Sequence, residues 1–160
     1  MGSRMFVGQE VHVVPVIAPV DITTTTTNTI PVGVKEYEAI EFIILFGAIT
    51  TDTAVLKVYE CDDTTPTTST AIAFKYRKTS AVGTDMTGAL TAGTSSGITI
   101  AVTDDNKCVL VDVDPAALTS GYPYVKLSLD PGASMTVCVL SAIAILKPRY
   151  PQAVQISAVD

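Results

Sequence analysis

The last third of the chain has the clearest alternation of apolar and polar positions. Val125, Leu127 and Leu129 fall on one side of an extended segment, and Lys126 and Ser128 fall between them on the other side. A repeat of two residues is typical of a β-strand with one buried face and one wet face. The pattern therefore predicts a half-buried strand over residues 124–129.

Turn chemistry follows this strand directly, at Asp130, Pro131 and Gly132. Proline holds φ near the value that a first turn position needs, and glycine can adopt positive φ. We therefore expect the chain to reverse and to return over residues 134–146 as the second strand of a hairpin. Almost every position of this second strand is apolar or small, which favours an interior strand covered on both faces. Pro148 and Pro151 end it.

A second long strand is predicted over residues 39–46. Ile40, Phe42 and Ile44 share one face of this segment, and Glu41 and Ile43 lie on the other. Because both faces are largely apolar, the strand is expected to be mostly buried.

Shorter strands are predicted between loops rich in threonine, glycine and aspartate. No segment keeps a helical period for more than a turn or two. Seven or eight strands without helices predict an all-β fold, an antiparallel two-sheet β-sandwich that can take a jelly-roll-like form. The additional strands are expected at residues 54–61, 71–77, 98–102 and 107–113, and the loops at 62–69 and 80–97.

The beginning of the chain, residues 1–29, reads as an extended arm, in which residues 1–4 can be the remnant of a tag before the second methionine. Pro15 and Pro19 interrupt its apolar part, and five threonines follow at residues 23–27. Proline forbids a helix there and confines any strand to a sheet edge. The arm is expected to lie either on this domain's own sheet or on a neighbouring subunit. The sandwich domain then covers residues 30–147, and residues 148–160 form a C-terminal tail.

The composition is unusually apolar for a single soluble domain. Of the 160 residues, 48% are hydrophobic and 16% are charged, and the mean hydropathy is +0.41. These values favour a protein that buries part of its surface against partners. The alternative is a domain with a large core and a surface coated with threonine.

Charge and cysteine content exclude several classes of protein. The net charge of −6 and the ten scattered Lys and Arg residues argue against binding to nucleic acid. The sequence has neither a membrane-spanning segment nor a signal pattern, so a membrane partner is not expected. Cys61, Cys108 and Cys138 are far apart and odd in number, which favours buried free thiols over a disulfide.

The residues needed for catalysis are sparse. His12 is the single histidine and lies in the proline-broken arm, so a nucleophilic triad built on it is not expected. The paired aspartates, such as Asp62 and Asp63, lack the spacing of a calcium loop. The glycines of residues 83–97 are not followed by the lysine of a phosphate-binding loop. We therefore expect neither an enzyme nor a bound metal or cofactor.

Four residues near the C-terminus belong to types that are enriched at binding hot spots: Tyr122, Tyr124, Arg149 and Tyr150. Their grouping fits an interface or a platform for a sugar. Ordinary packing of a sheet is the alternative.

Five segments, read in order, resemble a family of small head structural proteins of tailed bacteriophages: YEAIEFIILFGAIT, LKVYECDD, AIAF, YPYVKLSL and VLSAIAILKPRYP. In that family a G-A-I-T-like turn precedes a K-V-x-E-S-D-D-like strand, and a closing A-x-x-x-x-x-P-R-x-x-P segment follows. The likeness spans about residues 37–152, with Cys61 where the family prefers serine and Lys126 where it prefers arginine. The resemblance implies a capsid decoration, or cementing, protein that binds the outside of an assembled shell, often as a trimer.

Residue pattern and resemblance together lead to the hypothesis of a homotrimeric capsid decoration protein. Its partners would be the major capsid protein and further copies of itself, and it would be made in the host cytoplasm and reside on the outer capsid surface of the virion. The alternatives are another virion structural protein, from the tail, connector or fibre base, and a carbohydrate-binding β-sandwich. The expected contact residues are Phe6, Val7, Val11, Val13, Val14, Pro15, Val16, Ile17, Pro19, Val20, Ile22, Pro148, Arg149, Tyr150 and Pro151.

Overall fold

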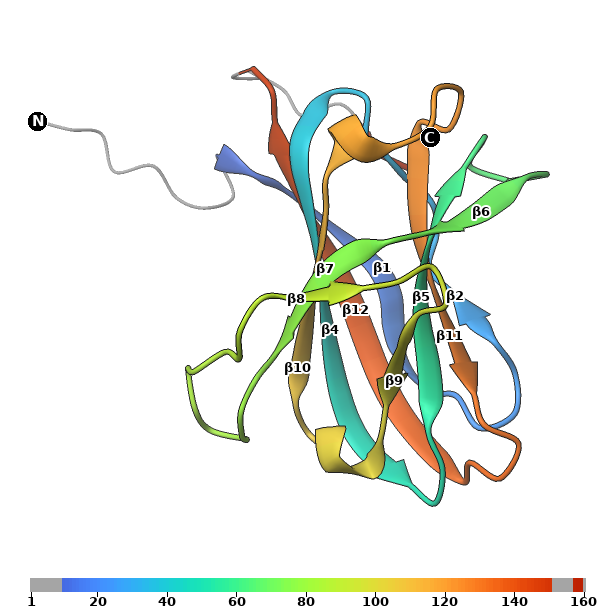
Figure 1. The fold of residues 1–160 in the computed structure, drawn as a ribbon, viewed down its shortest axis with the longest axis vertical. Helices are drawn as coiled ribbons and strands as arrows, with labels where there is room; N and C mark the ends of the chain where they lie inside the picture. Colours follow the sequence, from blue (N-terminus) through green and yellow to red (C-terminus); the bar gives the residue numbers. More distant parts are fainter. Residues whose placement is uncertain (1–9, 151–156, 160) are drawn as a thin grey trace, which may run out of the picture.

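A computed structural model describes residues 10–150 and 157–159 of the chain (Figure 1). Two antiparallel β-sheets pack face to face, which confirms the predicted all-β sandwich. Sheet A has the order β1 (His12–Asp21), β12 (Val137–Pro148), β4 (Tyr37–Thr50), β10 (Cys108–Val113), β7 (Phe74–Lys78) and β8 (Thr91–Gly93). Sheet B has the order β2 (Thr27–Asn28), β11 (Tyr124–Pro131), β5 (Ala54–Cys61) and β6 (Ser69–Ile72). In addition, β3 (Val32–Gly33) pairs with β11, and β9 (Ile98–Ile100) pairs with β5.

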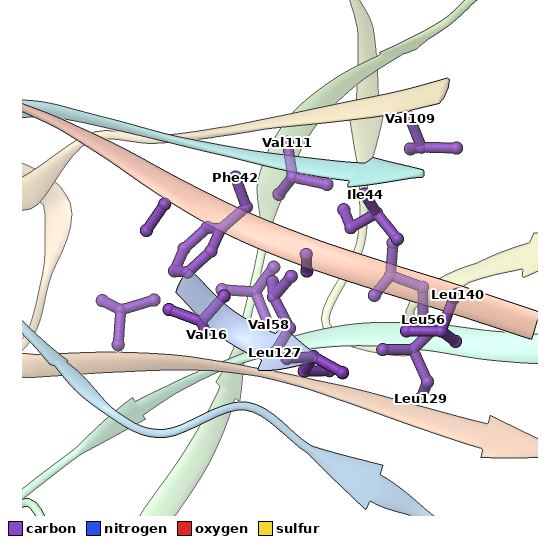
Figure 2. Packing of buried hydrophobic residues seen from close by; sticks show 14 of the residues in the cluster. Val16, Phe42, Ile44, Leu56, Val58, Val109, Val111, Leu127, Leu129 and Leu140 are labelled. Carbon is purple, nitrogen blue, oxygen red and sulfur yellow. The ribbon is translucent and has the colours of Figure 1, made fainter. Parts of the chain in front are cut away.

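The core lies between the two sheets and follows the predicted period of two. Phe42 and Ile44 of β4, which were predicted to share one face, are fully buried and point toward sheet B. Leu56, Leu127 and Leu129 meet them from β5 and β11 (Figure 2). Because alternate residues of a strand point to opposite faces, every buried residue of β4 leaves its neighbour on the outside of the sandwich.

The predicted hairpin of residues 122–151 is wrong in its pairing. The chain does reverse after Pro131, but β11 belongs to sheet B and pairs with β5, whereas β12 belongs to sheet A and lies between β1 and β4. The connection between them crosses the sandwich, with Met135 buried in it. Sheets pack about 10 Å apart, a distance that a few extended residues can span. Turn residues reveal that a chain reverses, but they do not select the strand with which it pairs.

The predicted strand at residues 71–77 is also wrong as a single element. It divides into β6, which pairs with β5 in sheet B, and β7, which pairs with β10 in sheet A. Ala73, which is exposed, lies at the crossing between the two sheets. Continuous alternation in the sequence hides the crossing, because both strands keep the same period and both face one core. The expected loop at residues 80–97 likewise contains a short strand, β8, that pairs with β7.

Residues 12–21 of the predicted arm form β1 on this chain's own sheet (Figure 1). The strand lies at the edge of sheet A, where the prolines predicted it, and pairs with β12. Its pairing shifts register between Pro15 and Ile17 and again between Ile17 and Val20. Proline cannot donate a ladder hydrogen bond, so these irregularities protect the edge from pairing with another strand.

The other sheet edges are short. Sheet A ends at the three residues of β8, and sheet B ends at the two-residue strands β2 and β3 on one side and at β6 and β9 on the other. Short edges offer little backbone for strand addition. Among the described residues, a face or a loop therefore offers more area for contact with a partner than a sheet edge does. In the part of the chain that the structure describes, no helix is long and apolar enough to cross a membrane.

The tail folds back on the body where it is described. The backbone N–H of Arg149 donates to the carbonyl oxygen of Glu36 at 3.0 Å, and Gly33 donates to the carbonyl oxygen of Ala158 at 2.6 Å. Ala158 is buried. These contacts place Arg149 and Ala158 at the same end of the sandwich.

Candidate functional site

The residues considered for chemistry have structural roles in this fold. His12 lies on β1, where its Nδ1 atom is 2.8 Å from the hydroxyl of the buried Tyr37. Asp62 accepts hydrogen bonds from the Thr67 hydroxyl and the Thr68 backbone, which lower the pKa of its carboxyl group. Within residues 10–150 and 157–159, no group of three or more His, Cys, Asp or Glu side chains is placed to hold a metal ion.

Two shallow depressions adjoin each other at the end of the sandwich that carries the tail. Tyr122 and Arg149 line the first, whose volume is about 430 Å³. Tyr124 lines the second, of about 190 Å³, and Lys35 borders both. Tyr150, 75% exposed, follows Arg149 in the chain. The tyrosines considered for a sugar platform thus gather at one end of the molecule, around two cationic side chains.

The outer surface of sheet A is apolar over most of its width. Leu45 on β4 is 57% exposed, and Ile43 and Ile143 beside it are only half-buried although they point away from the core. We call the outward-facing residues of β1, β12, β4, β10 and β7 the A face. It consists of Val13, Pro15, Glu41, Ile43, Leu45, Lys75, Arg77, Cys108, Leu110, Asp112, Val139, Ser141, Ile143 and Ile145.

The strand registers order the A face into rows. In one row, Pro15 pairs with Ile143, Ile143 with Ile43, and Ile43 with Leu110, so four neighbouring strands contribute adjacent apolar side chains. Leu45 lies two positions along β4 and pairs with Cys108. Side chains opposite each other in neighbouring strands are in contact distance, so these residues form one continuous patch.

The next row of the A face carries charge. Glu41 pairs with Asp112, and Asp112 with Lys75. Arg77 extends to Asp112, with 3.6 Å between its Nη2 atom and the Oδ2 atom of that carboxylate. Burial raises the pKa of Glu41, and the negative charge of Asp112 raises it further, while Arg77 acts in the opposite direction. A small cluster of charged side chains therefore lies within the otherwise apolar A face.

The outer surface of sheet B has a different character. Lys57, Tyr59 and Lys126 point outward from β5 and β11, and the Lys126 ammonium lies 5.7 Å from the centre of the Tyr59 ring. Polar and amphipathic side chains of this kind are suited to water. The two outer faces described for this sandwich thus differ, and of the two that of sheet A is the extended apolar one.

The contact residues predicted from the sequence differ in exposure, and the structure divides them into exposed, half-buried and buried residues. Val13, Pro15, Pro19 and Val20 are exposed on β1, and the first two belong to the A face. Pro148 and Val11 are half-buried, and Arg149 and Tyr150 are exposed at the tail end. Four others, Val14, Val16, Ile17 and Ile22, are buried in the core of the same chain. Phe6, Val7 and Pro151 lie outside the described residues.

Most of the A face was not among the residues expected from the sequence. The signal was present in the apolar outward positions of residues 39–46 and 134–146, such as Ile43 and Ile143. Apolar residues on both faces of these segments predict burial on both sides. In a sandwich of two layers each sheet has only one covered face, so β12 is interior within its sheet but open on its outer side.

The three cysteines are free thiols, as predicted. Cys61 and Cys138 are buried, whereas Cys108 is half-buried on the A face. Burial raises the pKa of all three thiols, that of Cys138 to about 11, with the charge of Asp21 adding to the effect there.

We expect a maleimide at pH 7.5 to modify Cys108 alone in the folded protein, and more slowly than an unhindered cysteine. Thiolate is the reactive form, so a raised pKa slows the reaction, and the rate should increase with pH. Peptide mass spectrometry measures the sites, and unfolding in urea should release all three. Modification of Cys138 in the native protein at the rate of Cys108 would contradict the assignment of these strand faces.

Comparisons with known proteins add little to this description. No protein-family model matches the chain, and no curated protein matches it. A chain from the crystal structure of the T13 particle of IBDV is similar with a TM-score of 0.27 and 8% identity over 89% of this chain. A chain from the structure of the infectious bursal disease virus Gt strain is similar with a TM-score of 0.27 and 10% identity over 92% of this chain. This chain spans 40% and 44% of the length of those two chains.

Proposed function

We propose that this chain is a non-enzymatic structural protein of a virion. In the specific form of the proposal, it is a decoration protein that binds the outer surface of an assembled bacteriophage head, as a homo-oligomer and most simply as a trimer. The sequence resemblance suggests this class. The observation that carries the proposal is the A face, an extended apolar surface on a domain whose sheet edges are short or blocked by proline.

Such a surface has a physical consequence in water. Burial of apolar area is favourable by roughly 25 cal/mol per Å², so an open apolar face favours association with a matching surface. The prolines of β1 and the shortness of β8 disfavour extension of the sheet by another strand. Contact through a face leaves sheet B and its lysines exposed to solvent, as an external protein requires.

Stabilisation of the shell would follow from mass action. A protein that binds the assembled lattice and not the separate subunits lowers the free energy of the assembled state by an amount that grows with its concentration. Neither catalysis nor a cofactor is required. Many weak contacts, one for each bound copy, are sufficient to stabilise the shell.

The test is binding to isolated heads that lack the protein. We expect purified protein to sediment with such heads, to saturate, and to appear by electron microscopy as many copies spread over the shell. Light scattering on the free protein measures its oligomeric state. A protein that ignores heads would contradict decoration, and density confined to the tail or connector would assign it to another part of the virion.

Binding of a carbohydrate is a second candidate, favoured by the position of Tyr122 and Tyr124 in adjacent depressions beside Lys35. A glycan array would reveal saturable binding, and replacement of both tyrosines by alanine should abolish it. The absence of any binding to the array would remove this candidate.

A further inference from the structure

The larger of the two depressions at the tail end of the sandwich is bordered by two cationic side chains, Lys35 and Arg149. We propose that it binds an acidic carbohydrate, a sugar with a carboxylate on its ring, with Arg149 and Lys35 at the carboxylate and Tyr122 against the ring. The inference deepens the second candidate function, the binding of a carbohydrate, and does not depend on binding to heads.

Arg149 is held in place by the body of the protein. It follows β12 directly, and its backbone N–H donates to the carbonyl oxygen of Glu36 while its Nε–H donates to the carbonyl oxygen of Tyr37, each at 3.0 Å. Tyr37 is buried, so this anchor is fixed. The Nη atoms carry the remaining donors of the planar guanidinium, and their geometry matches the two oxygens of a carboxylate. Among the described residues, no carboxylate forms an ion pair with Arg149, so its guanidinium is preorganised for an anion from outside.

Lys35 supplies a second positive charge from another part of the chain. It lies between β3 and β4, where the Val34 N–H donates to the carbonyl oxygen of Pro123 at 2.9 Å and the Tyr37 N–H donates to that of Val34 at 3.0 Å. Val34 and Pro123 both line the depression, so these bonds fix the segment to its wall. Lys35 is exposed, and within residues 10–150 and 157–159 it belongs to no ion pair. An anion in the depression would therefore face two cations at once.

Three carboxylates belong to the surrounding segments, and each has another place. Glu60 is buried and accepts a hydrogen bond from the Thr119 N–H at 2.8 Å. Asp114 accepts one from the Ala116 N–H at 2.9 Å. Glu36 borders the smaller depression, and of the described residues that line the larger one none is Asp or Glu. A carboxylate ligand is thus favoured in the larger depression and repelled from the smaller one.

The remaining walls of the larger depression suit a sugar ring. Val34 and Pro115 are buried, and Leu118 and Pro123 are half-buried, so part of its lining is apolar. Tyr122 adds an aromatic ring with a polar hydroxyl. The volume of about 430 Å³ lies in the range of small-ligand sites. A sugar acid has a charged group, hydroxyls and apolar C–H faces, so it can use the cations and the apolar walls together.

The net charge of the chain does not prevent the binding of an anion at this place. The chain has 10 Lys and Arg residues against 16 Asp and Glu residues, so distant parts of the surface repel an acid. At physiological ionic strength, exposed charges more than about 8 Å away are largely screened. The two cations that border the depression therefore determine its preference, and added salt should weaken binding.

The experiment compares the carboxylated, sulfated and neutral members of a glycan array, with sialic and uronic acids both represented in the first class. We expect the wild-type protein to bind carboxylated members at least about tenfold more tightly than their neutral counterparts, as charge-assisted hydrogen bonds imply. Titration calorimetry with sialyllactose and with lactose, at low and high salt, measures the difference that one acidic sugar makes.

Arg149→Gln and Lys35→Gln should each weaken binding of carboxylated glycans by roughly tenfold. Arg149→Lys keeps the charge but loses the planar fork, so it should restore binding only in part. The matched control is Lys147→Gln, which changes the net charge equally at an exposed lysine that pairs with Glu38 and does not line the depression. Its binding should remain within about twofold of wild type. Thermal unfolding checks each variant, and Lys35→Gln tests the site even if the Arg149 variants are less stable.

The outcomes separate this inference from the candidate function that it deepens. Absence of any binding to the array removes both. Equal binding of neutral and carboxylated glycans retains the carbohydrate function but overturns the acidic ligand, and a preference for sulfated glycans overturns the carboxylate. Unchanged selectivity in Arg149→Gln and Lys35→Gln, or an equal loss in Lys147→Gln, overturns the assignment to this depression.

Discussion

Replacement of Leu45 by aspartate is expected to remove binding to assembled heads while the protein still folds. Leu45 is 57% exposed at the centre of the A face, so that the change leaves the core intact. In the docked state the new carboxylate would be placed in an apolar contact beside Ile43 and Cys108. Loss of a central hot spot typically costs about 2 kcal/mol or more, which corresponds to a decrease in affinity of roughly 30-fold. Quantitative sedimentation with heads measures this affinity.

The matched control is Val102→Asp. Val102 is 48% exposed and lies in the short 3-10 helix η1 (Val102–Asp104), which does not belong to the A face, so the same change in charge occurs at similar exposure. We expect its binding to remain within about twofold of wild type. Equal losses in both variants would indicate a general effect of negative charge, and retention of binding by Leu45→Asp would exclude the A face as the docking surface.

The second large effect is expected in stability. Phe42→Ala removes a ring that is fully buried between the two sheets (Figure 2). Large-to-small changes of this kind lose the transfer free energy of the side chain and leave a cavity, so the free energy of unfolding should decrease by about 3–5 kcal/mol. Urea denaturation followed by circular dichroism gives the value.

Ile43→Ala is the comparison for Phe42→Ala, one residue further along β4. Ile43 points outward and is half-buried, so the loss of stability should be about 1 kcal/mol. Its larger effect should be on head binding, because it lies in the apolar row of the A face. Similar losses of stability at both positions would contradict the assignment of the two faces of β4.

The two variants of β4 also bear on the unusually apolar composition of the chain. The high hydrophobic content predicted a surface buried against partners, or alternatively a large core. The structure shows a full core between the sheets and, in addition, the apolar A face with Leu45 exposed. The core and the A face both contribute to the high hydrophobic content, and measurements of head binding will determine whether the A face is an interface.

Local pattern determined the fold class and the individual strands. The period of two in residues 54–61 predicted β5 with its bounds, and that of residues 39–46 separated Phe42 and Ile43 onto opposite faces, although both faces were expected to be buried. Pro15 and Pro19 placed β1 at an edge. These features depend on side-chain geometry and backbone chemistry within a few residues, which a sequence displays directly.

Only the tertiary structure decided which strands pair and which faces remain open. The turn at Pro131 and Gly132 leads from sheet B to sheet A, and Ala73 marks a crossing that the alternation does not reveal. Of the candidate site, the sequence identified Val13 and Pro15 but not the rows that run through Ile43 and Ile143. An apolar strand has the same sequence whether one or both of its faces are covered, because the covering comes from residues far away in the chain or from another molecule.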